Sequence, residues 1–318
     1  MKIAMIGSGA AGSVFAAYLK KGGADDITLV DRYKAHMDKI AESGLVMKDP
    51  TGEYHLEGFK TAYSAEDIGI MDVVVLMVKA TQTDSAMKSA MKCIGPDTVV
   101  VTLQNGLGND ERLKKYVPGN RLIFGCGNMG TELPEPGRCV SKPFPGNNMF
   151  FGPSEKCGRT DAVGKYIEEC FTKGGLSPRY YDDVRPYVWR KATSNSGFNT
   201  TCAILRSKVR YVAADENGMA LVWQIWREAA DVAEALGIPG IWEYMQEQFP
   251  SILASIGDYY PSMAQDVVLN QRETEVTCLT GAISDYGKKV GVPTPTCDVL
   301  TQVVKYLEAN YENMYKGE

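Results

Sequence analysis

The sequence predicts an α/β protein in which an N-terminal doubly wound parallel sheet precedes an all-helical C-terminal domain. Short apolar runs alternate with helical segments in the first half, a glycine-rich turn follows the first run, and the pattern is helical from about residue 183. Strands that alternate with helices form parallel sheets covered on both faces. Because 318 residues exceed one typical core, we expect two domains, 1–181 and 182–318, with a cleft between them.

The expected strands are short and nearly continuous apolar runs, which suits strands buried on both faces. They cover residues 3–6, 27–30, 73–78, 98–103 and 122–124, and residues 147–152 and 179–181 are expected to complete the sheet. Helices are expected over residues 13–21, 189–199, 218–236, 275–290 and 296–311. Residues 218–236 are amphipathic, because their apolar side chains recur at helical spacing.

The composition excludes several classes of function. The net charge of −5 offers no basic excess for nucleic acid or for an anionic membrane. No uninterrupted apolar stretch is long enough to span a membrane, so we expect a cytoplasmic protein. With two histidines, and eight cysteines that form no CxxC pair, we expect no metal site and thiols of a reducing compartment.

A glycine-rich turn, Gly7-Ser8-Gly9-Ala10-Ala11-Gly12, follows the first expected strand and opens the first helix. In this motif the first glycine permits a tight turn, the second lets the backbone approach a pyrophosphate, and the third allows close helix–strand packing. The helix N-terminus adds N–H groups and a positive dipole. The motif alone is weak evidence, but its place between a strand and a helix predicts a Rossmann-type dinucleotide site that uses all six residues.

An acidic residue, Asp31, closes the second expected strand 19 positions after Gly12. A carboxylate at this place accepts hydrogen bonds from ribose hydroxyls and favours NADH. Arg32 follows directly and offers the opposite arrangement, a pairing with the 2′-phosphate of NADPH. We therefore expect NAD(P)H as the cofactor, with NADH favoured by Asp31 and NADPH left open through Arg32.

Two polar residues stand where further strands end. Lys79 follows the strand over residues 73–78, and Asn105 follows the strand over residues 98–103. Ligands of open α/β sheets bind outside the carboxyl ends of the strands. An exposed lysine and an Asn-Gly turn are the structural alternatives, yet the shared position favours contact with a ligand, above all for Asn105.

Lys191, Asn195 and Asn199 are spaced four apart and would line one face of a helix. One ammonium and two carboxamides can hydrogen-bond a small oxygen-rich molecule and give it a proton. A solvated lysine is the ordinary alternative, but two asparagines in line need a reason beyond helix propensity. Further along, Ser262 would cap a helix or face a ligand, and Glu275 would be a surface carboxylate or would pair with Lys191.

Taken together, these motifs resemble those of the ketopantoate reductase family, the 2-dehydropantoate 2-reductases. No single segment is as specific as the combination, which follows the family's order over nearly the whole chain. The matching segments are Gly7-Ser8-Gly9-Ala10-Ala11-Gly12, Val78-Lys79-Ala80, Leu103-Gln104-Asn105-Gly106, Lys191-x3-Asn195-x3-Asn199, Pro261-Ser262-Met263-x-Gln265-Asp266 and Thr274-Glu275.

The resemblance implies an enzyme that reduces a small 2-keto acid, ketopantoate, to (R)-pantoate with NAD(P)H, on the route to pantothenate and coenzyme A. It implies that Lys191 is the general acid that protonates the ketone oxygen as hydride reaches the carbon. It also implies that Asn195, Asn199 and Ser262 hold the substrate. In the same way, Asn105 would touch both substrate and cofactor, and Glu275 would lie near the cofactor and the lysine.

Two features depart from the family pattern. Many members carry a further asparagine after Asn199 that helps to hold the substrate, and residues 205–210 contain none. Asp31 also differs from the arginine-only arrangement expected of an NADPH enzyme. An NAD-dependent D-2-hydroxyacid dehydrogenase that acts on another branched or aromatic 2-keto acid is therefore the alternative function. In either case Arg206, Lys208 or Arg210 would bind a substrate carboxylate or provide surface charge.

Two further classes of protein fit the sequence less well. A dinucleotide-binding regulator without catalysis would not need the proton donor Lys191. Hydroxyisobutyrate and phosphogluconate dehydrogenases share the general plan but match the Ser262 and Glu275 segments less closely. The tryptophans of the helical domain, Trp223, Trp226 and Trp242, would serve a homodimer contact or, as the default, a buried core.

Overall fold

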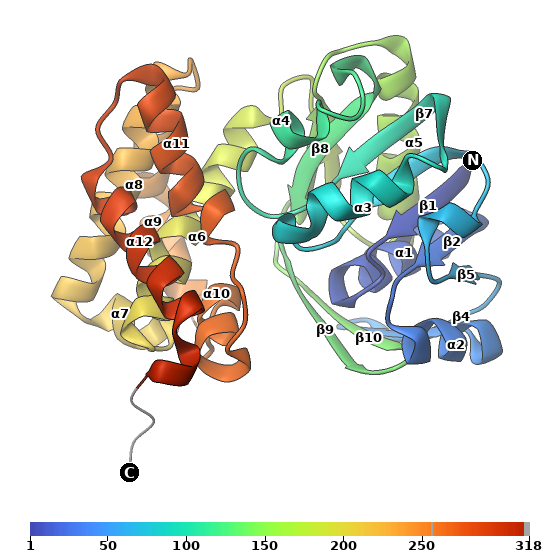
Figure 1. Ribbon diagram of the computed structural model, residues 1–318, viewed down its shortest axis with the longest axis horizontal. Coiled ribbons are helices and arrows are strands. Elements are labelled where there is room, and N and C mark those ends of the chain that lie inside the picture. The colour runs from blue at the N-terminus through green and yellow to red at the C-terminus, as the bar shows by residue number, and fades with distance from the viewer. Residues whose placement is uncertain (256, 315–318) are drawn as a thin grey trace. The chain divides into compact units, whose positions relative to one another are not determined.

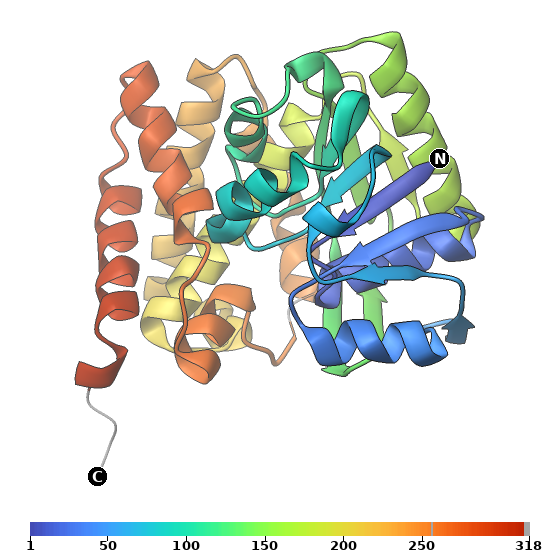
Figure 2. The ribbon, with the colours of Figure 1, turned by 45° about the vertical axis from the view of Figure 1, so that its right-hand side comes forward.

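The structure of the protein is a computed structural model that describes residues 1–255 and 257–314. The chain divides into two compact units: Met1–Asn105 with Asn109–Val184, and Gly106–Gly108 with the chain from Arg185 onward. The first unit contains sheets and helices, and the described residues of the second contain helices without strands (Figures 1 and 2). The predicted fold class, a doubly wound parallel sheet with an all-helical C-terminal part, is confirmed.

The main sheet of the first unit has eight strands, in the order β5-β2-β1-β6-β7-β8-β11-β12. The first six are mutually parallel, and only β8 and β11 pair antiparallel. Counted along the chain, the parallel strands follow the order 3-2-1-4-5-6 of dinucleotide-binding folds. The bounds are β5 (Lys60–Ala62), β2 (Asp26–Val30), β1 (Lys2–Ile6), β6 (Met71–Leu76), β7 (Ile94–Thr102), β8 (Leu122–Gly127), β11 (Met149–Pro153) and β12 (Pro178–Tyr180).

The side chains of the central strands alternate between the two faces of this sheet. Ile3 and Met5 of β1 join a core with α1 (Ala10–Lys21) and α5 (Gly158–Gly174). Ala4 and Ile6 join another core with α3 (Thr83–Ala90) and α4 (Asn109–Leu113). Because helices cover both faces, these strands are apolar at nearly every position, which is why the sequence revealed them.

A second sheet, of four strands, was not predicted. Its order is β4-β3-β10-β9, and it comprises β3 (Leu45–Asp49), β4 (Gly52–Leu56), β9 (Met129–Glu135) and β10 (Arg138–Pro143). β4 and β9 are mostly exposed or half-buried, so they show no apolar run. The Tyr18 hydroxyl links this sheet to α1, since it lies 3.0 Å from Ser141 Oγ on β10 and 3.3 Å from Asp49 Oδ2 on β3. The first unit also contains α2 (Lys34–Ser43) and the 3-10 turns η1 (Ala65–Asp67), η2 (Ala80–Gln82) and η3 (Gly119–Arg121).

In the second unit, α6 (Arg185–Leu205) packs against most of the other helices. The other α-helices of this unit are α7 (Val209–Ala214), α8 (Glu216–Ala235), α9 (Ile241–Ser255), α10 (Ser262–Ala264), α11 (Thr280–Val290) and α12 (Pro295–Ala309), and the π-helical turn η4 (Gln265–Asn270) follows α10. The prediction of one helix over residues 275–290 is wrong at its start. Glu275 precedes the short 3-10 turn η5 (Val276–Cys278), and the backbone of Leu279, at φ −113° and ψ −109°, interrupts the helix before α11.

Three further observations bear on the expected classes of protein. No helix in the described part of the chain is long and apolar enough to cross a membrane. All eight cysteines are free thiols, and all but Cys157 are buried. Residues 1–255 and 257–314 contain no group of three or more histidine, cysteine, aspartate or glutamate side chains that could hold a metal ion.

Candidate active site

The glycine-rich turn lies at the carboxyl end of β1, where the strand order of the main sheet reverses. Gly7 has φ +89°, and a Cβ there would lie 2.6 Å from the Val78 nitrogen, just beyond β6, so only glycine fits. A Cβ on Gly12 would lie 2.0 Å from the Gly7 carbonyl oxygen. A Cβ on Gly9, in contrast, would meet no atom within 4 Å. The turn is thus closely packed on its inner side and open at Gly9, which fits the close approach of a phosphate.

The helix that begins at this turn has no side-chain cap. Gly9 is the N-cap of α1, and the first turn, which starts with Ala10 and Ala11, contains no acidic residue. Its N–H groups and dipole therefore suit an anion. The Ser8 side chain is buried, donates to the Met5 carbonyl and accepts from Val30 N–H. The Ser8 backbone N–H also donates to the Val30 carbonyl at 3.2 Å, so Ser8 ties the turn to the end of β2.

Asp31 and Arg32 follow β2, the strand beside β1. One Asp31 carboxylate oxygen accepts a hydrogen bond from Tyr33 N–H at 2.9 Å, which holds the side chain at the end of the strand. Asp31 is half-buried and Arg32 is exposed. Both residues lie at the carboxyl edge of the sheet, where the motif predicts the ribose contact.

Lys79 and Asn105 follow the neighbouring strands β6 and β7, and a buried glutamine joins the two strand ends. The Gln104 amide nitrogen donates to the Val78 carbonyl at 2.7 Å, and its amide oxygen accepts from the Thr102 hydroxyl at 2.8 Å. Lys79 is half-buried, and Asn105 is exposed. The motif Leu103-Gln104-Asn105-Gly106 contains Gln104 but does not by itself reveal this supporting role, and its place beside Asn105 is the one signal in the sequence.

In the second unit, α6 carries Lys191, Asn195 and Asn199 on one face, as their spacing predicted. Lys191 and Asn195 are half-buried, and Asn199 is 8% exposed. The opposite face packs on α8, where a Cβ on Gly197 would lie only 2.4 Å from Trp226 Nε1. This close packing turns the polar face away from α8, because positions two apart on a helix point in nearly opposite directions.

Ser262 is joined to this polar face. The Asn199 amide nitrogen donates to Ser262 Oγ at 3.3 Å. Ser262 is the first residue of α10, whose N-cap is Pro261, so the alternative in which the Ser262 hydroxyl caps a helix is wrong. The predicted substrate-binding residues Asn199 and Ser262 therefore form one polar cluster.

Glu275 lies on a segment that hydrogen bonds anchor on both sides. Before it, the backbone N–H of Thr274 donates to Glu308 Oε1 at 2.8 Å. After it, the carbonyl oxygen of Cys278 accepts from Leu107 N–H at 2.8 Å. Glu275 itself is half-buried. Its backbone is thus fixed within the second unit, as a residue that orients another group would require.

The positive residues after α6 provide surface charge. Lys208 Nζ lies 3.0 Å and Arg210 Nε lies 3.2 Å from an Asp258 carboxylate oxygen. The Arg206 guanidinium lies 3.1 Å from Met314 Sδ. All three side chains have protein partners, which favours surface charge over the binding of a substrate carboxylate.

The tryptophans of the second unit contact one another. Trp226 is fully buried, its ring centroid lies 4.9 Å from that of Trp223, and Trp223 lies 5.6 Å from Trp242. The default interpretation, an aromatic core, therefore holds for Trp226. A homodimer through the helical domain stays a prediction.

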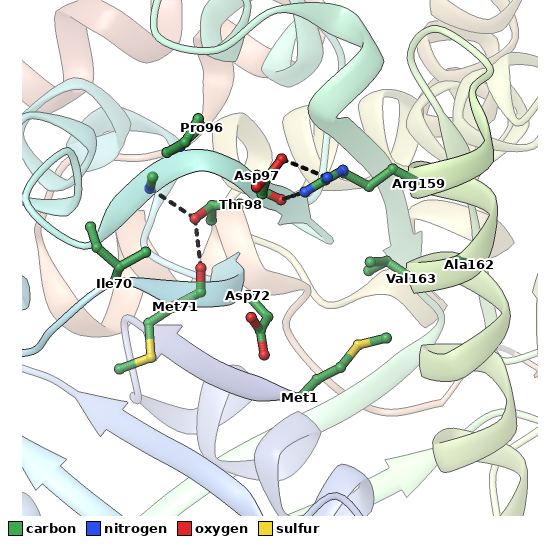
Figure 3. Close-up of a pocket in the computed structure, with 11 residues that line it drawn as sticks. Met1, Ile70, Met71, Asp72, Pro96, Asp97, Thr98, Arg159, Ala162 and Val163 are labelled. Carbon is green, nitrogen blue, oxygen red and sulfur yellow. Dashed lines mark hydrogen bonds and ion pairs between the residues drawn. The ribbon is translucent and has the colours of Figure 1, made fainter.

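A pocket of about 580 Å³ opens at the opposite, amino-terminal edge of the main sheet (Figure 3). Its polar side chains are engaged: Arg159 pairs with Asp97, and the Thr98 hydroxyl donates to the Met71 carbonyl. Asp72 Oδ2 accepts a hydrogen bond from Lys2 N–H at 2.7 Å. Ligands of such folds bind at the carboxyl ends of the strands. The pocket is therefore separate from the glycine-rich turn, and none of the predicted site residues lines it.

Comparison with known proteins identifies the family. Residues 3–154 match the family Ketopantoate reductase PanE/ApbA, and residues 183–308 match its C-terminal counterpart. The 2-dehydropantoate 2-reductase of Streptococcus pyogenes serotype M18 is 30% identical over 310 residues, which cover 97% of this chain and 98% of the relative. That of Lactococcus lactis is 31% identical, with 96% and 97% covered. The chain belongs to the ketopantoate reductase family.

Solved structures of two relatives have the same fold. A ternary structure of D-mandelate dehydrogenase with NADH and anilino(oxo)acetate has a TM-score of 0.86 and 29% identity, over 98% of this chain and 99% of the other. The 2-dehydropantoate 2-reductase of Geobacter metallireducens has a TM-score of 0.86 and 27% identity, with 96% and 99% covered. As a member of the ketopantoate reductase family, the protein is an NAD(P)-dependent oxidoreductase.

Proposed function

We propose that the protein reduces ketopantoate to (R)-pantoate with NAD(P)H. The polar face of α6 carries this proposal, because Lys191 with Asn195 and Asn199 supplies a proton donor and substrate-binding groups that dinucleotide binding alone does not need. The glycine-rich turn supports it with the open space at Gly9 and the uncapped start of α1. The family membership adds the reaction type.

In this proposal each group has one task. Bound NAD(P)H would supply hydride to the ketone carbon of the substrate. Negative charge then develops on the ketone oxygen, where the Lys191 ammonium stabilises it and donates a proton. Asn195, Asn199 and Ser262 hold the remaining oxygen atoms of the substrate.

Glu275 and Asn105 complete the proposed site. The Glu275 carboxylate holds the Lys191 ammonium in position near the cofactor. Asn105, at the end of β7, contacts both substrate and cofactor. Lys79 and Asp31, with the six residues of the glycine-rich turn, hold the dinucleotide. These assignments rest on the family's motifs and on the positions of the residues at strand ends and helix faces.

The open question of the cofactor concerns Asp31 and Arg32. We propose that Asp31 accepts the ribose hydroxyls and so favours NADH, since Tyr33 N–H already holds its carboxylate at the strand end. Asp31→Ala should lower kcat/KM for NADH by about tenfold or more, as expected for the loss of hydrogen bonds to a charged group. Arg32→Ala is the matched control and should leave the NADH values within about twofold. A strong preference of the wild-type protein for NADPH that Arg32→Ala abolishes would contradict the assignment.

The substrate is tested by initial rates with ketopantoate, 2-ketoisovalerate and phenylpyruvate, each with NADH and with NADPH. The proposal predicts the highest kcat/KM for ketopantoate, by about tenfold or more, or about 1.4 kcal/mol of transition-state preference. A simple branched or aromatic keto acid that exceeds ketopantoate by such a margin would overturn ketopantoate reduction as the function.

A D-2-hydroxyacid dehydrogenase activity on such an acid is the second candidate. One observation favours it: residues 205–210 lack the additional asparagine of many family members. The fold does not separate the two candidates, since D-mandelate dehydrogenase and a 2-dehydropantoate 2-reductase both match it with a TM-score of 0.86. The same kinetic experiment decides between the two functions, because both use the same general acid but differ in the side chain of the acid they accept.

Three statements about the organisation of the protein belong to the proposal. Residues 1–181 and 182–318 would be separate domains, which limited proteolysis with mass analysis of the fragments would test. The helical domain would form a homodimer, which light scattering on the eluting protein would test. The enzyme would work in the cytoplasm, as a biosynthetic enzyme that draws on the NAD(P)H pool of the cell, and cell fractionation would test this.

A further inference from the structure

A buried histidine is linked to the glycine-rich turn by a short chain of hydrogen bonds. His36, on α2, is 0% exposed. Its Nδ1 accepts from the backbone N–H of Gly137, in the turn between β9 and β10, at 2.8 Å. Its Nε2 lies 2.9 Å from Ser13 Oγ, and the Ser13 hydroxyl donates to the Ser8 carbonyl at 2.8 Å. Three separate segments of the first unit thus meet through one imidazole.

The donors in this chain fix the state of the ring. Gly137 N–H can only donate, so Nδ1 carries no proton and Nε2 carries one. The Ser13 hydroxyl gives its single proton to the Ser8 carbonyl, so it must accept from His36 Nε2–H. Every polar atom then has a complementary partner, and only the neutral Nε2–H tautomer satisfies this pattern. Burial lowers the pKa of His36, which favours the neutral ring, while the Asp31 carboxylate acts in the opposite direction.

The final acceptor in this chain, the Ser8 carbonyl, belongs to the peptide bond that joins Ser8 to Gly9. In a trans peptide the N–H group points away from the carbonyl of the same plane. A Ser8 carbonyl held inward by Ser13 therefore directs the Gly9 N–H away from Ser13. Gly9 is the position where an added Cβ would meet open space. The orientation of one peptide plane thus connects the histidine to the open side of the turn.

We propose that His36 is a positioning residue for the dinucleotide, which acts through Ser13 to fix the Ser8–Gly9 peptide in the orientation that receives the pyrophosphate. This inference rests on the proposed cofactor site. It assigns His36 no contact with substrate or cofactor. It predicts a loss of cofactor affinity, with little change in turnover once the cofactor is saturating.

Two conservative variants divide the chain of hydrogen bonds into its halves. His36→Gln places an amide nitrogen near the position of Nε2, so it keeps a donor to Ser13 but loses the acceptor for Gly137. His36→Asn places an amide oxygen near the position of Nδ1, so it keeps the acceptor for Gly137 but does not reach Ser13. Ser13→Ala removes the same hydrogen bond to Ser13 that His36→Asn removes. If the link from His36 through Ser13 to Ser8 determines cofactor affinity, His36→Asn and Ser13→Ala should have the same effect.

The test is direct titration of each purified variant with NADH and with NADPH, together with kcat at saturating cofactor. His36→Asn and Ser13→Ala should each raise the Kd of the preferred cofactor about tenfold, whereas the Kd of His36→Gln should stay within about threefold of the wild-type value. In all three variants kcat should stay within about twofold of the wild-type value. The double variant that combines His36→Asn with Ser13→Ala should bind the cofactor no more weakly than Ser13→Ala alone, because both changes remove the same hydrogen bond between His36 and Ser13. Thermal unfolding without cofactor shows whether the Kd values merely follow stability.

Three outcomes would overturn the inference. The first is equal cofactor affinity in His36→Asn and His36→Gln. The second is an additive double variant. The third is a nitrogen-15 NMR spectrum in which the His36 ring is not the neutral Nε2–H tautomer. That spectrum is recorded without cofactor. Because the chain has only two histidines, the ring signals that disappear in a His36 variant are those of His36. A wild-type protein that binds neither NADH nor NADPH would instead defeat the proposed function, and this inference with it, even if the tautomer is as expected.

Discussion

The two candidate ligand-binding regions of the protein are built on different principles. In the first unit the backbone would bind the ligand: Gly7 and Gly12 let strand, turn and helix approach closely, and Gly9 leaves space beside the uncapped start of α1. In the second unit side chains would bind it: Lys191, Asn195 and Asn199 project from a single face of α6. The first region depends on glycines, which have no side chain, and the second depends on the polar side chains of α6.

This difference determines how each region should respond to mutation. A backbone site fails when an added atom fills its space or moves its peptide planes, even if no functional group is removed. A side-chain site fails when a functional group is deleted, while the fold that supports it persists. Substitutions in both regions therefore test this contrast.

Lys191→Ala should have the largest effect, on turnover. Loss of a general acid typically costs about 10²–10⁴-fold in rate, so kcat should fall by that range while the Kd of NADH changes little. Steady-state kinetics of keto acid reduction and an NADH titration measure the two quantities. Lys288→Ala, which removes an exposed lysine of the same unit that pairs with Asp298, is the matched control. Unchanged turnover in Lys191→Ala would remove Lys191 from the mechanism.

Gly197→Ala should destabilise the helical unit. Its methyl group would be forced against Trp226 Nε1 at 2.4 Å and Val222 Cγ1 at 2.9 Å, and overpacking of this kind costs about 1–3 kcal/mol. Chemical denaturation measures the free energy of unfolding. Gly158→Ala, where a new Cβ would meet nothing within 4 Å, is the control and should stay within about 0.5 kcal/mol of the wild type. Equal stability of the two variants would show that α6 and α8 do not pack as closely as described.

Gly9→Ala should weaken cofactor binding without harming the fold. The added methyl group meets no protein atom within 4 Å, so the unfolding temperature without cofactor should match the wild type. The same methyl group would occupy the space proposed for the pyrophosphate and should raise the Kd of NADH by about tenfold or more, or about 1.4 kcal/mol.

Gly12→Ala provides the contrast to Gly9→Ala. Its methyl group would lie 2.0 Å from the Gly7 carbonyl oxygen, so it should lower the unfolding temperature as well as the affinity. If Gly9→Ala binds NADH normally, the dinucleotide does not approach the turn at this glycine.

Ser262→Ala should have the smallest effect and should act on substrate binding. Ser262 Oγ accepts a hydrogen bond from Asn199 at 3.3 Å, and loss of one such hydrogen bond typically costs about 0.5–1.5 kcal/mol. The KM of the keto acid should therefore rise about two- to tenfold, with kcat nearly unchanged. An effect confined to the KM of NADH would contradict the assignment of Ser262 to substrate binding.

The contrast between the regions also explains what the sequence could predict. Glycine spacing and four-residue spacing are local patterns, so the turn and the face of α6 were both found before the structure. The groups that support them were not, because their partners are distant in sequence: His36 accepts from Gly137, and Gln104 donates to Val78. The second sheet was missed for a related reason, since β4 and β9 expose too many residues to form an apolar run.

We propose that the backbone site and the side-chain site act on one reaction, and the product formed from ketopantoate and NADH tests this proposal most directly. It predicts (R)-pantoate, resolved by chiral chromatography, in a one-to-one ratio with the NADH oxidised, and loss of that product in Lys191→Ala although NADH still binds. If the wild-type protein binds NADH yet forms no pantoate while another 2-keto acid is reduced, the claim that ketopantoate is the substrate is contradicted.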